Sequence, residues 1–313
     1  MPDSGTVPSR STVSVVVPTW RRARDLGNCL EALSKQGVPP LEIVVVWRQG
    51  DDGVHEVLDR WAPRLPLRSV EVDRPGVVAA MNRGLDEVVG EIVALTDDDG
   101  APHPDWIRRI GSIYRDQPDV VAFGGRDLVH EQGGILPATS HRVGELSWFG
   151  RASGNHHAGL GGARDVRFLK GVNCSFRRNA LQGLRFEEKL RGKGAQSHWE
   201  LAFFLELGRR GRIVYDPTLL VDHYPAIRFD VDQREAFHPE AMSDAAYNET
   251  FVLLRQVKPM FLPVFVAWAF LIGHTASPGL LQAFRHGIFG TRPKIWRTLL
   301  ASWRGRWDAI LCR

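Results

Sequence analysis

The sequence is poor in cysteine, and the cysteines that it has form no pattern for a metal site or a disulfide scaffold. Among its 313 residues there are three, Cys29, Cys174 and Cys312, which are widely spaced and include no CxxC pair. Disulfide-rich secreted domains and structural zinc sites both need closely spaced cysteines. This set therefore indicates a reducing compartment, in which Cys29 and Cys174 serve as small buried side chains.

A signal peptide, a clear membrane span and internal repeats are also missing. Residues 1–12 lack the apolar core of a secretory leader, so we expect a disordered N-terminus and a cytoplasmic protein. The longest apolar run covers residues 259–273 and contains Pro263, and it is shorter than the roughly 20 residues that span a bilayer. With 43% hydrophobic and 24% charged residues, the composition is typical of a folded globular protein.

The formal net charge is only +4, but basic residues gather near the C-terminus. From Thr275 onward the chain has seven lysines and arginines against one acid, Asp308. Such a segment needs an anionic partner or solvent around it. Because no nucleic-acid-binding motif accompanies it, we expect no nucleic acid as a partner.

Apolar runs alternate with helical patterns through the first hundred residues. The runs that predict strands buried on both faces are residues 13–17, 41–47, 67–72 and 92–95. Between them, apolar residues recur at helical spacing in residues 26–33, 54–61 and 77–88. This βαβαβαβ order predicts an α/β fold with a doubly wound, mostly parallel sheet.

Three consecutive carboxylates, Asp97, Asp98 and Asp99, follow the fourth predicted strand. Residues i and i+2 of an extended chain share a face, so Asp97 and Asp99 converge while Asp98 points away as a bystander. Two convergent carboxylates suit a divalent cation that holds phosphate oxygens, and a solvated acidic turn is the alternative. Ligands of doubly wound sheets bind beyond the carboxyl ends of the strands, which favours the metal. The segments on that rim are residues 18–22, 47–52, 73–76 and 97–99.

Four segments together resemble the nucleotide-binding half of the family-2 inverting glycosyltransferases, which have the Rossmann-like GT-A fold. The segments read SVVVPTWRRARDLGNCLEAL, EIVVV, PGVVAAMNRGLD and IVALTDDDGAPHPDWI, and the likeness extends from about Val13 to His223. The first strand and the Asp cluster are specific in combination, although each is weak alone. The resemblance implies a UDP-, GDP- or dTDP-sugar donor, Mg²⁺ or Mn²⁺ as cofactor, and inverting transfer of the sugar to an acceptor hydroxyl.

The same resemblance implies roles for individual residues on the donor side. Pro18, Thr19 and Arg22 would wrap the base and contact the diphosphate, although an ordinary strand-to-helix turn is the alternative. The remaining donor-side roles are Arg83 facing the diphosphate, Asp97 near the base or ribose, Asp99 on the metal, and His223 completing the metal shell. For Arg83 and His223, a surface side chain is the alternative.

One departure from the family lies after the second predicted strand. The family usually has an Asp-Asp-Gly-Ser segment there, whose first Asp contacts the base, whereas this chain has Trp47 and Arg48. Asp51 or Asp52 could substitute if the loop is longer. The departure leaves the base contact open.

An inverting transfer needs a carboxylate that takes the proton of the acceptor hydroxyl. In many relatives an E-D dipeptide opens the helix that carries this base, and the corresponding place here reads His198-Trp199-Glu200. Glu200 is the first candidate base and His198 the second, with a structural helix glutamate as the alternative. The resemblance places Trp106 and Asn173 on the acceptor side, and the glycine-rich residues 126–167 suit an acceptor loop or lid.

We divide the chain into residues 1–12, a GT-A domain at 13–235 and a helical appendage at 236–313. Within the domain, residues 13–125 would bind the nucleotide and residues 126–235 the acceptor. In the appendage, one helical face would carry Trp296, Leu299, Leu300, Trp303, Trp307, Ile310 and Leu311, with Arg297, Arg304 and Arg306 off it. This pattern is typical of a helix lying at a membrane surface, and packing on the domain or at a dimer contact is the alternative. We predict a peripheral or anchored position at the inner face of the cell membrane.

The sequence thus predicts a metal-dependent, inverting hexosyltransferase that acts in surface polysaccharide, glycolipid or cell-wall assembly on a carbohydrate or lipid-linked acceptor. The Gln-x-x-Arg-Trp element of processive relatives is missing, which favours transfer of one sugar per encounter. Two alternatives remain. A sugar nucleotidyltransferase would need a glycine-rich phosphate loop after the first strand, and a non-catalytic membrane scaffold would keep the fold without the chemistry.

Overall fold

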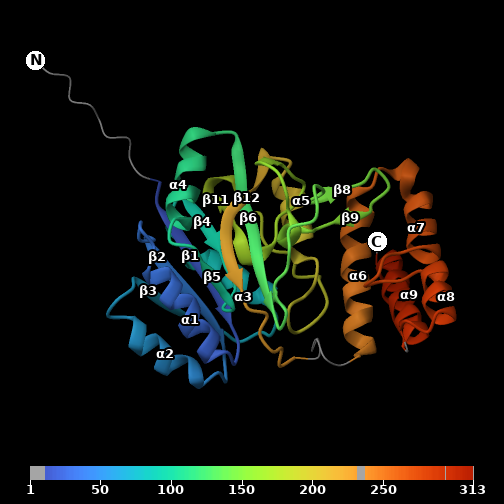
Figure 1. Ribbon diagram of the computed structural model, residues 1–313, viewed down its shortest axis with the longest axis horizontal. Helices are drawn as coiled ribbons and strands as arrows, with labels where there is room; N and C mark the ends of the chain where they lie inside the picture. Colours follow the sequence, from blue (N-terminus) through green and yellow to red (C-terminus); the bar gives the residue numbers. More distant parts are fainter. Residues whose placement is uncertain (1–10, 231–236, 293, 313) are drawn as a thin grey trace, which may run out of the picture.

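The computed structural model describes residues 11–230, 237–292 and 294–312 (Figure 1). A ten-stranded sheet forms one body, and a group of helices from the C-terminal part of the chain lies beside it. The predicted disordered N-terminus falls almost wholly outside the described residues, and so does the predicted domain boundary at residues 235 and 236.

Four neighbouring strands are parallel and form the half of the sheet that the sequence predicts. In spatial order they are β4 (Ile92–Leu95), β1 (Val13–Thr19), β2 (Glu42–Arg48) and β3 (Leu67–Val72). The connecting helices are α1 (Ala23–Ser34), α2 (Gly53–Trp61) and α3 (Val77–Glu87). The predicted βαβαβαβ order is confirmed, with boundaries that shift by a few residues.

The other half of the sheet is mixed, because an antiparallel strand lies beside β4. β11 (Cys174–Arg177) pairs antiparallel with β4 and with β6 (Val120–Glu131), and β12 (Arg212–His223) then pairs parallel with β6. The short strands of this sheet are β5 (Gly100–Pro102), β7 (Gly134–Ile135) and β10 (Arg164–Asp165). A separate hairpin consists of β8 (Glu145–Leu146) and β9 (Ala152–Ser153). The helices of this half are α4 (Trp106–Asp116), α5 (Trp199–Leu207), η1 (His156–Ala158), η2 (Gly171–Asn173) and η3 (Arg178–Ala180).

Alternate residues of β1 point into two different cores, one on each face of the sheet. Val15 and Val17 belong to a cluster with residues of α1, α2 and α4, whereas Val16 belongs to a cluster with residues of α3 and α5. Both faces of the strand are therefore covered, which explains its continuous β-branched apolar run. Cys29 and Cys174 are buried in these cores, as predicted.

Residues 237–312 form the C-terminal helical unit, which packs beside the sheet domain. α6 (Pro239–Gln256) runs along α9 (Ile295–Leu311), and the remaining helices are η4 (Pro259–Phe261), α7 (Leu262–Leu271) and α8 (Leu280–Ile288) (Figure 1). α6 and α9 meet closely at Gly305, where a Cβ atom would lie 2.0 Å from the carbonyl oxygen of Ser243. Among the helices of the described residues, none has the length and apolar character that a membrane crossing requires.

The packing of α9 differs from the sequence prediction. Arg306, which was expected beside the solvent-facing arginines, is 1% exposed and donates hydrogen bonds to the carbonyl oxygens of Ser277 at 2.6 Å and Pro278 at 3.2 Å. Trp296, Leu300 and Trp307 from the predicted apolar stripe are exposed, whereas Leu299 from the same stripe is buried. The physical reason is that α9 buries its small residues, which allow a closer approach to α6 than tryptophan would. These buried small residues are Ala301, Ser302, Gly305 and Ala309.

Two glycine substitutions test the packing of the sheet domain. A Cβ atom on Gly84 in α3 would lie 2.6 Å from Val16 Cγ1, so Gly84→Ala should lower the free energy of unfolding by about 1–3 kcal/mol through overpacking. Gly27 in α1 has no atom within 4 Å of its Cβ position, so Gly27→Ala should raise that free energy by roughly 0.5–1 kcal/mol through helix propensity. Urea unfolding followed by circular dichroism measures both. An equal effect of the two substitutions would contradict the packing of α3 on β1.

Candidate functional site

A cavity of about 460 Å³ opens at the carboxyl ends of the parallel strands. The ends of β1, β2, β3 and β12 and the turn after β4 contribute to its wall, which is where a doubly wound sheet binds its ligand. Its volume suits a small-molecule ligand. The residues predicted as functional that line this cavity are Pro18, Thr19, Arg22, Asp97, Asp99, His198, Glu200 and His223.

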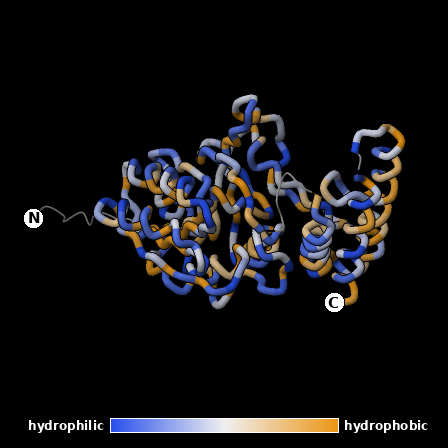
Figure 2. The backbone as a smooth tube through the Cα atoms, turned by 90° about the horizontal axis from the view of Figure 1, so that it is seen from below, coloured by the Kyte–Doolittle hydropathy of each residue, from blue (hydrophilic) through white to orange (hydrophobic). Residues whose placement is uncertain are grey.

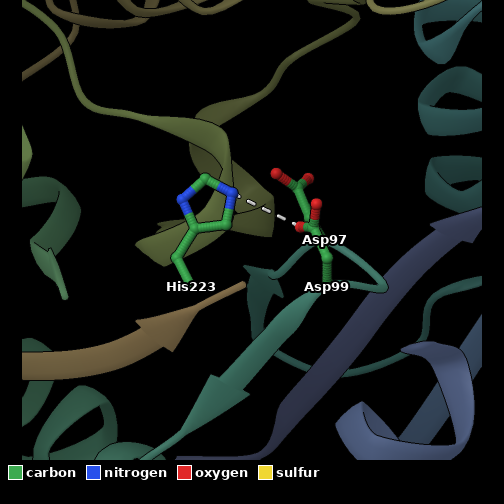
Figure 3. Close-up of side chains that lie close together, drawn as sticks. All are labelled: Asp97, Asp99 and His223. Atoms are coloured by element: carbon green, nitrogen blue, oxygen red, sulfur yellow. Dashed lines mark ion pairs between the residues drawn. The ribbon is translucent and has the colours of Figure 1, made fainter. Parts of the chain in front are cut away.

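Asp97, Asp99 and His223 lie together in this cavity (Figure 3). Each offers one ligand atom, and these atoms all lie within 4.8 Å of one another. The two aspartates come from the turn after β4, and His223 ends β12, where it pairs with Gly100 of β5. Two carboxylates and an imidazole form a donor set that divalent Mn²⁺ accepts.

One oxygen atom of Asp99 has no hydrogen-bond partner among the described residues. Its Oδ2 accepts a hydrogen bond from the backbone N–H of Ala226 at 2.9 Å, and its Oδ1 lies 3.5 Å from His223 Nε2. Oδ1 is buried and has no hydrogen bond within the described part of the chain. A buried carboxylate oxygen without a hydrogen bond is costly unless a cation satisfies it, so these residues fit a divalent metal.

Asp98 is more than the bystander that the sequence analysis expected. It lines the same cavity as Asp97 and Asp99, is buried, and accepts hydrogen bonds from Thr19 Oγ1 and Arg22 Nη1, both at 2.8 Å. Burial raises the pKa of the Asp98 carboxyl to about 7, and the Arg22 guanidinium opposes that rise. Asp98 therefore joins the β1–α1 loop to the turn that carries the other two aspartates.

His223 is held from behind by Asp127, which the sequence analysis missed. Asp127 in β6 is fully buried; its Oδ2 lies 3.2 Å from His223 Nδ1 and accepts a hydrogen bond from Lys170 Nζ. Burial acts against ionisation, yet the His223 and Lys170 contacts hold the pKa of Asp127 below its usual range. A carboxylate on the far nitrogen of a histidine fixes the ring orientation toward a metal. No local motif marks Asp127, because only the pairing of β6 with β12 brings it there.

Near the end of β2, Arg48 lies where the sequence comparison led us to expect an aspartate. The Arg48 guanidinium lies 3.5 Å from the centroid of the Trp20 ring and pairs with Asp230 at 3.4 Å, and all three residues line the cavity. Asp51 is buried and accepts a hydrogen bond from the backbone N–H of Arg21 at 2.5 Å. Asp52 is exposed at the start of α2. Neither Asp51 nor Asp52 is part of the cavity wall.

Glu200 lies in the first turn of α5 and lines the cavity together with Asp97, Asp99 and His223. Burial raises the pKa of its carboxyl to about 7, and the nearby Asp97 charge acts in the same direction. His198 immediately precedes α5 in a left-handed backbone conformation, and burial lowers the pKa of its ring. The site therefore has a carboxylate that can exchange a proton near neutral pH.

Besides Asp51 and Asp52, three further predicted site residues lie outside the cavity wall. Arg83 forms an ion pair with Glu87 at 2.5 Å, one turn along α3, instead of facing the cavity. Trp106 Nε1 donates a hydrogen bond to Asn173 Oδ1 at 2.8 Å, and both side chains are buried. Asn173 in turn donates to the carbonyl oxygen of Leu219 at 2.9 Å. This pair therefore joins α4, η2 and β12 within the core.

Residues 8–237 match the sequence model of "Glycosyltransferase like family 2". Among curated relatives, the glucosyl-dolichyl phosphate glucuronosyltransferase of Haloferax volcanii is 26% identical over 229 residues, which cover 67% of this chain and 68% of that one. Glycosyltransferase AglE of the same organism is 29% identical over 127 residues, covering 39% of this chain and 41% of that one.

Solved structures of glycosyltransferases share the fold. A mannosyltransferase from Pyrobaculum calidifontis in complex with GDP-Man and Mn²⁺ aligns over 96% of this chain and 88% of its own, with a TM-score of 0.60 and 21% identity. GalNAc-T7 with UDP, GalNAc and Mn²⁺ aligns over 84% of this chain and 50% of its own, with a TM-score of 0.63 and 14% identity. At 21% and 14% identity, these alignments show that the chain shares the GT-A fold.

Proposed function

The chain belongs to the glycosyltransferase-like family 2 and is a glycosyltransferase, and from this premise we propose an inverting, metal-dependent transfer of one sugar per encounter. The donor is a nucleoside-diphosphate sugar, and the acceptor is a hydroxyl of a carbohydrate or lipid-linked molecule. The observation that carries the proposal is one cavity that contains both the Asp97, Asp99 and His223 group and the Glu200 carboxyl.

Asp97, Asp99 and His223 would hold Mg²⁺ or Mn²⁺, with Asp127 fixing the orientation of His223. When bound, the cation neutralises the diphosphate of the donor, which makes it a better leaving group. Asp99 Oδ1, which has no hydrogen bond among the described residues, supports this assignment. Two solved neighbours were crystallised with Mn²⁺ and a nucleotide or nucleotide sugar, which supports the same pairing of metal and donor here.

The β1–α1 loop would bind the nucleotide. Arg22 lies at the cavity with its charge directed toward Asp98 and Asp99, at 2.8 and 3.9 Å. Its guanidinium has further donors for phosphate oxygens. Trp20 and Arg48 offer a flat stacked surface beside it for the base or ribose.

Glu200 would act as the general base. The acceptor hydroxyl gives its proton to the Glu200 carboxylate, a new bond forms between the acceptor oxygen and C1 of the sugar, and the bond from C1 to the phosphate oxygen breaks. The nucleoside diphosphate leaves with the electron pair of that bond. Attack from the face opposite the leaving group inverts the configuration at C1.

The C-terminal helical unit would bind an anionic membrane surface, which suits a lipid-linked acceptor in surface polysaccharide, glycolipid or cell-wall assembly. Leu281, Phe284 and Ile288 form an exposed stripe on α8, and the Phe284 ring meets the Trp296 ring of α9 at 5.1 Å. Trp296 continues the stripe to Leu300 and Trp307. Figure 2 shows apolar segments along the outer helices of this unit. Exposed arginines beside the stripes, Arg285, Arg297 and Arg304, would meet the anionic headgroups.

A panel of nucleotide sugars with Mn²⁺ tests the activity. The purified protein should hydrolyse or transfer from one donor, and Asp99→Ala should lower the rate roughly a hundredfold or more, since a catalytic metal is worth several kcal/mol. Asp98→Asn is the matched control, because it should leave Mn²⁺ affinity unchanged in titrations followed by electron paramagnetic resonance. Absence of turnover with every donor, or full activity of Asp99→Ala, would contradict the proposed function.

The pH profile tests the base. Because Glu200 acts as a base and its pKa is raised to about 7 by burial, kcat/KM should fall about tenfold per pH unit below that pKa and level off above it. Glu200→Gln should remove most of the activity, and the remaining kcat/KM should no longer fall at low pH; this acidic fall is the limb of the profile that Glu200 would cause. His198→Gln is the comparison: if it abolishes the limb and Glu200→Gln does not, His198 is the base.

Vesicle sedimentation tests the membrane surface. The full chain should bind vesicles of phosphatidylglycerol and phosphatidylcholine more tightly than phosphatidylcholine alone, and high salt should weaken the binding. Ile288→Glu combined with Phe289→Glu, both exposed at the end of α8, should lower binding about tenfold or more by loss of apolar insertion. Leu41→Glu, an exposed apolar site in the sheet domain, is the control. Equal binding of all three proteins would refute the assignment.

A further inference from the structure

One wall of the cavity is a loop that leads directly into α5 and the Glu200 carboxyl. We call residues 191–198 the cavity loop. Those that line the cavity are Lys193, Gly194, Ala195, Ser197 and His198. The position of this loop therefore sets both the shape of the cavity wall and the place from which Glu200 reaches the acceptor.

The cavity loop has a backbone conformation that needs external support. Gln196 has a φ of 42° and His198 a φ of 73°, both in the left-handed region that residues other than glycine rarely adopt. Such conformations cost free energy and persist only where surrounding contacts hold them. The contacts that hold this loop come from two directions.

On one side, the cavity loop caps the N-terminus of α3. The backbone N–H of Val77 donates to the carbonyl oxygen of Gly194 at 3.0 Å, and the N–H of Val78 donates to Gln196 Oε1 at 3.0 Å. These two N–H groups belong to the first turn of the helix, where no intrahelical partner exists. The contact therefore joins the loop to the nucleotide-binding half.

On the other side, a single amide of the C-terminal helical unit joins both ends of the cavity loop. Asn248 in α6 is 0% exposed. Its Oδ1 accepts a hydrogen bond from the backbone N–H of Arg191 at 2.7 Å, and its Nδ2 donates to the carbonyl oxygens of Arg191 at 3.0 Å and Ser197 at 3.1 Å. Asn248 thus satisfies three backbone groups of the loop at once.

The Arg191 side chain ties the same end of the loop to two helices. Its Nη1 lies 2.7 Å from Asp308 Oδ2 of α9, and its guanidinium lies 3.8 Å from the centroid of the Tyr247 ring of α6. All of these partners follow residue 237, where the match to the family ends. The cavity loop belongs to the family-matched segment, yet its supports on this side lie outside that segment.

We propose that Asn248 is a positioning residue, through which the C-terminal helical unit holds the cavity loop and the start of α5 in the geometry needed for transfer. The proposal rests on the proposed function of the cavity. It gives the helical unit a role in the reaction itself, independent of any membrane. Loss of the Asn248 amide releases both ends of the loop, while the metal-binding group, carried by β4 and β12, keeps its place.

Kinetics of Asn248→Leu test this role, since leucine keeps the number and branching of the side-chain heavy atoms and removes all three hydrogen bonds. We expect kcat to fall roughly 10- to 100-fold, the range for misplaced catalytic groups, with Mn²⁺ and nucleoside-diphosphate affinity within about threefold of the parent. Thr250→Val is the matched control, because Thr250 is buried on the same helix and, among the described residues, its hydroxyl donates to the Ala246 carbonyl oxygen within that helix and not to the loop. It should keep the parental kcat.

Trypsin provides a measurement that does not depend on catalysis, because the cavity loop contains Arg191 and Lys193. Cleavage after these two residues, quantified by mass spectrometry, should be at least about fivefold faster in Asn248→Leu than in the parent, since local opening governs proteolysis. Asp308→Asn, which removes a half-exposed ion pair, should accelerate the same cleavage to a smaller extent. This variant also tests the loop if Asn248→Leu fails to fold.

The outcomes separate this proposal from the proposed function. If the parent protein turns over no donor while Asn248→Leu is cleaved in the loop, the proposed function fails and the loop contact stands. If the parent is active and Asn248→Leu keeps its kcat and its cleavage rate, the positioning role is wrong. It is also wrong if Thr250→Val and Asn248→Leu lose activity equally and in proportion to their thermal midpoints, because that result indicates general destabilisation.

Discussion

The arrangement of the site depends on how the protein partners three carboxylates at the end of one buried strand. Neighbouring negative charges away from water are unfavourable unless each has a partner. Asp98 pairs with Arg22 of the β1–α1 loop, and Asp99 takes a hydrogen bond from the Ala226 N–H just beyond β12. Both carboxylates thus bring separate segments to the turn after β4. The remaining donor atoms of Asp97, Asp99 and His223 face one another, where a cation would complete the balance of charge.

The buried groups around His223 are also partnered by groups of opposite charge. Asp127 stands behind its ring and is itself balanced by Lys170, so a chain of contacts runs from the turn after β4 through β12 to β6 and the segment before β11. Along this chain each charged or polar group has the next one as its partner: Asp99 contacts His223, His223 contacts Asp127, and Asp127 contacts Lys170. A change in any of these side chains therefore acts on the metal-binding group by orientation as well as by charge.

The C-terminal helical unit has two surfaces with different character. Its inner side holds the cavity loop through Asn248 and is fastened by the buried Arg306, which bonds to carbonyl oxygens after α7. Its outer side has the exposed aromatic and aliphatic stripes of α8 and α9. The same unit thus has an apolar outer side and, on its inner side, contacts with the loop that leads into α5.

The sequence alone predicted the elements whose signal is local. Val13 to Val17 and Ile92 to Leu95 were identified as strands because a strand buried on both faces must be apolar at every position, and the Asp97 and Asp99 pair followed from the two-residue period of the strand. The family was identified from the same stretches. These inferences need no knowledge of distant contacts.

Only the tertiary structure decided which distant residues meet. The antiparallel insertion of β11, the contact of Asp127 with His223, the burial of Arg306 and the three hydrogen bonds of Asn248 join positions that are far apart in the chain. Arg83 was expected at the diphosphate, but Glu87, one turn along the same helix, pairs with it. The physical reason is that a single sequence records the period of each element, whereas the partner of a polar side chain depends on the register and packing between elements. The register and packing between elements depend in turn on the total apolar surface that all elements of the core bury together.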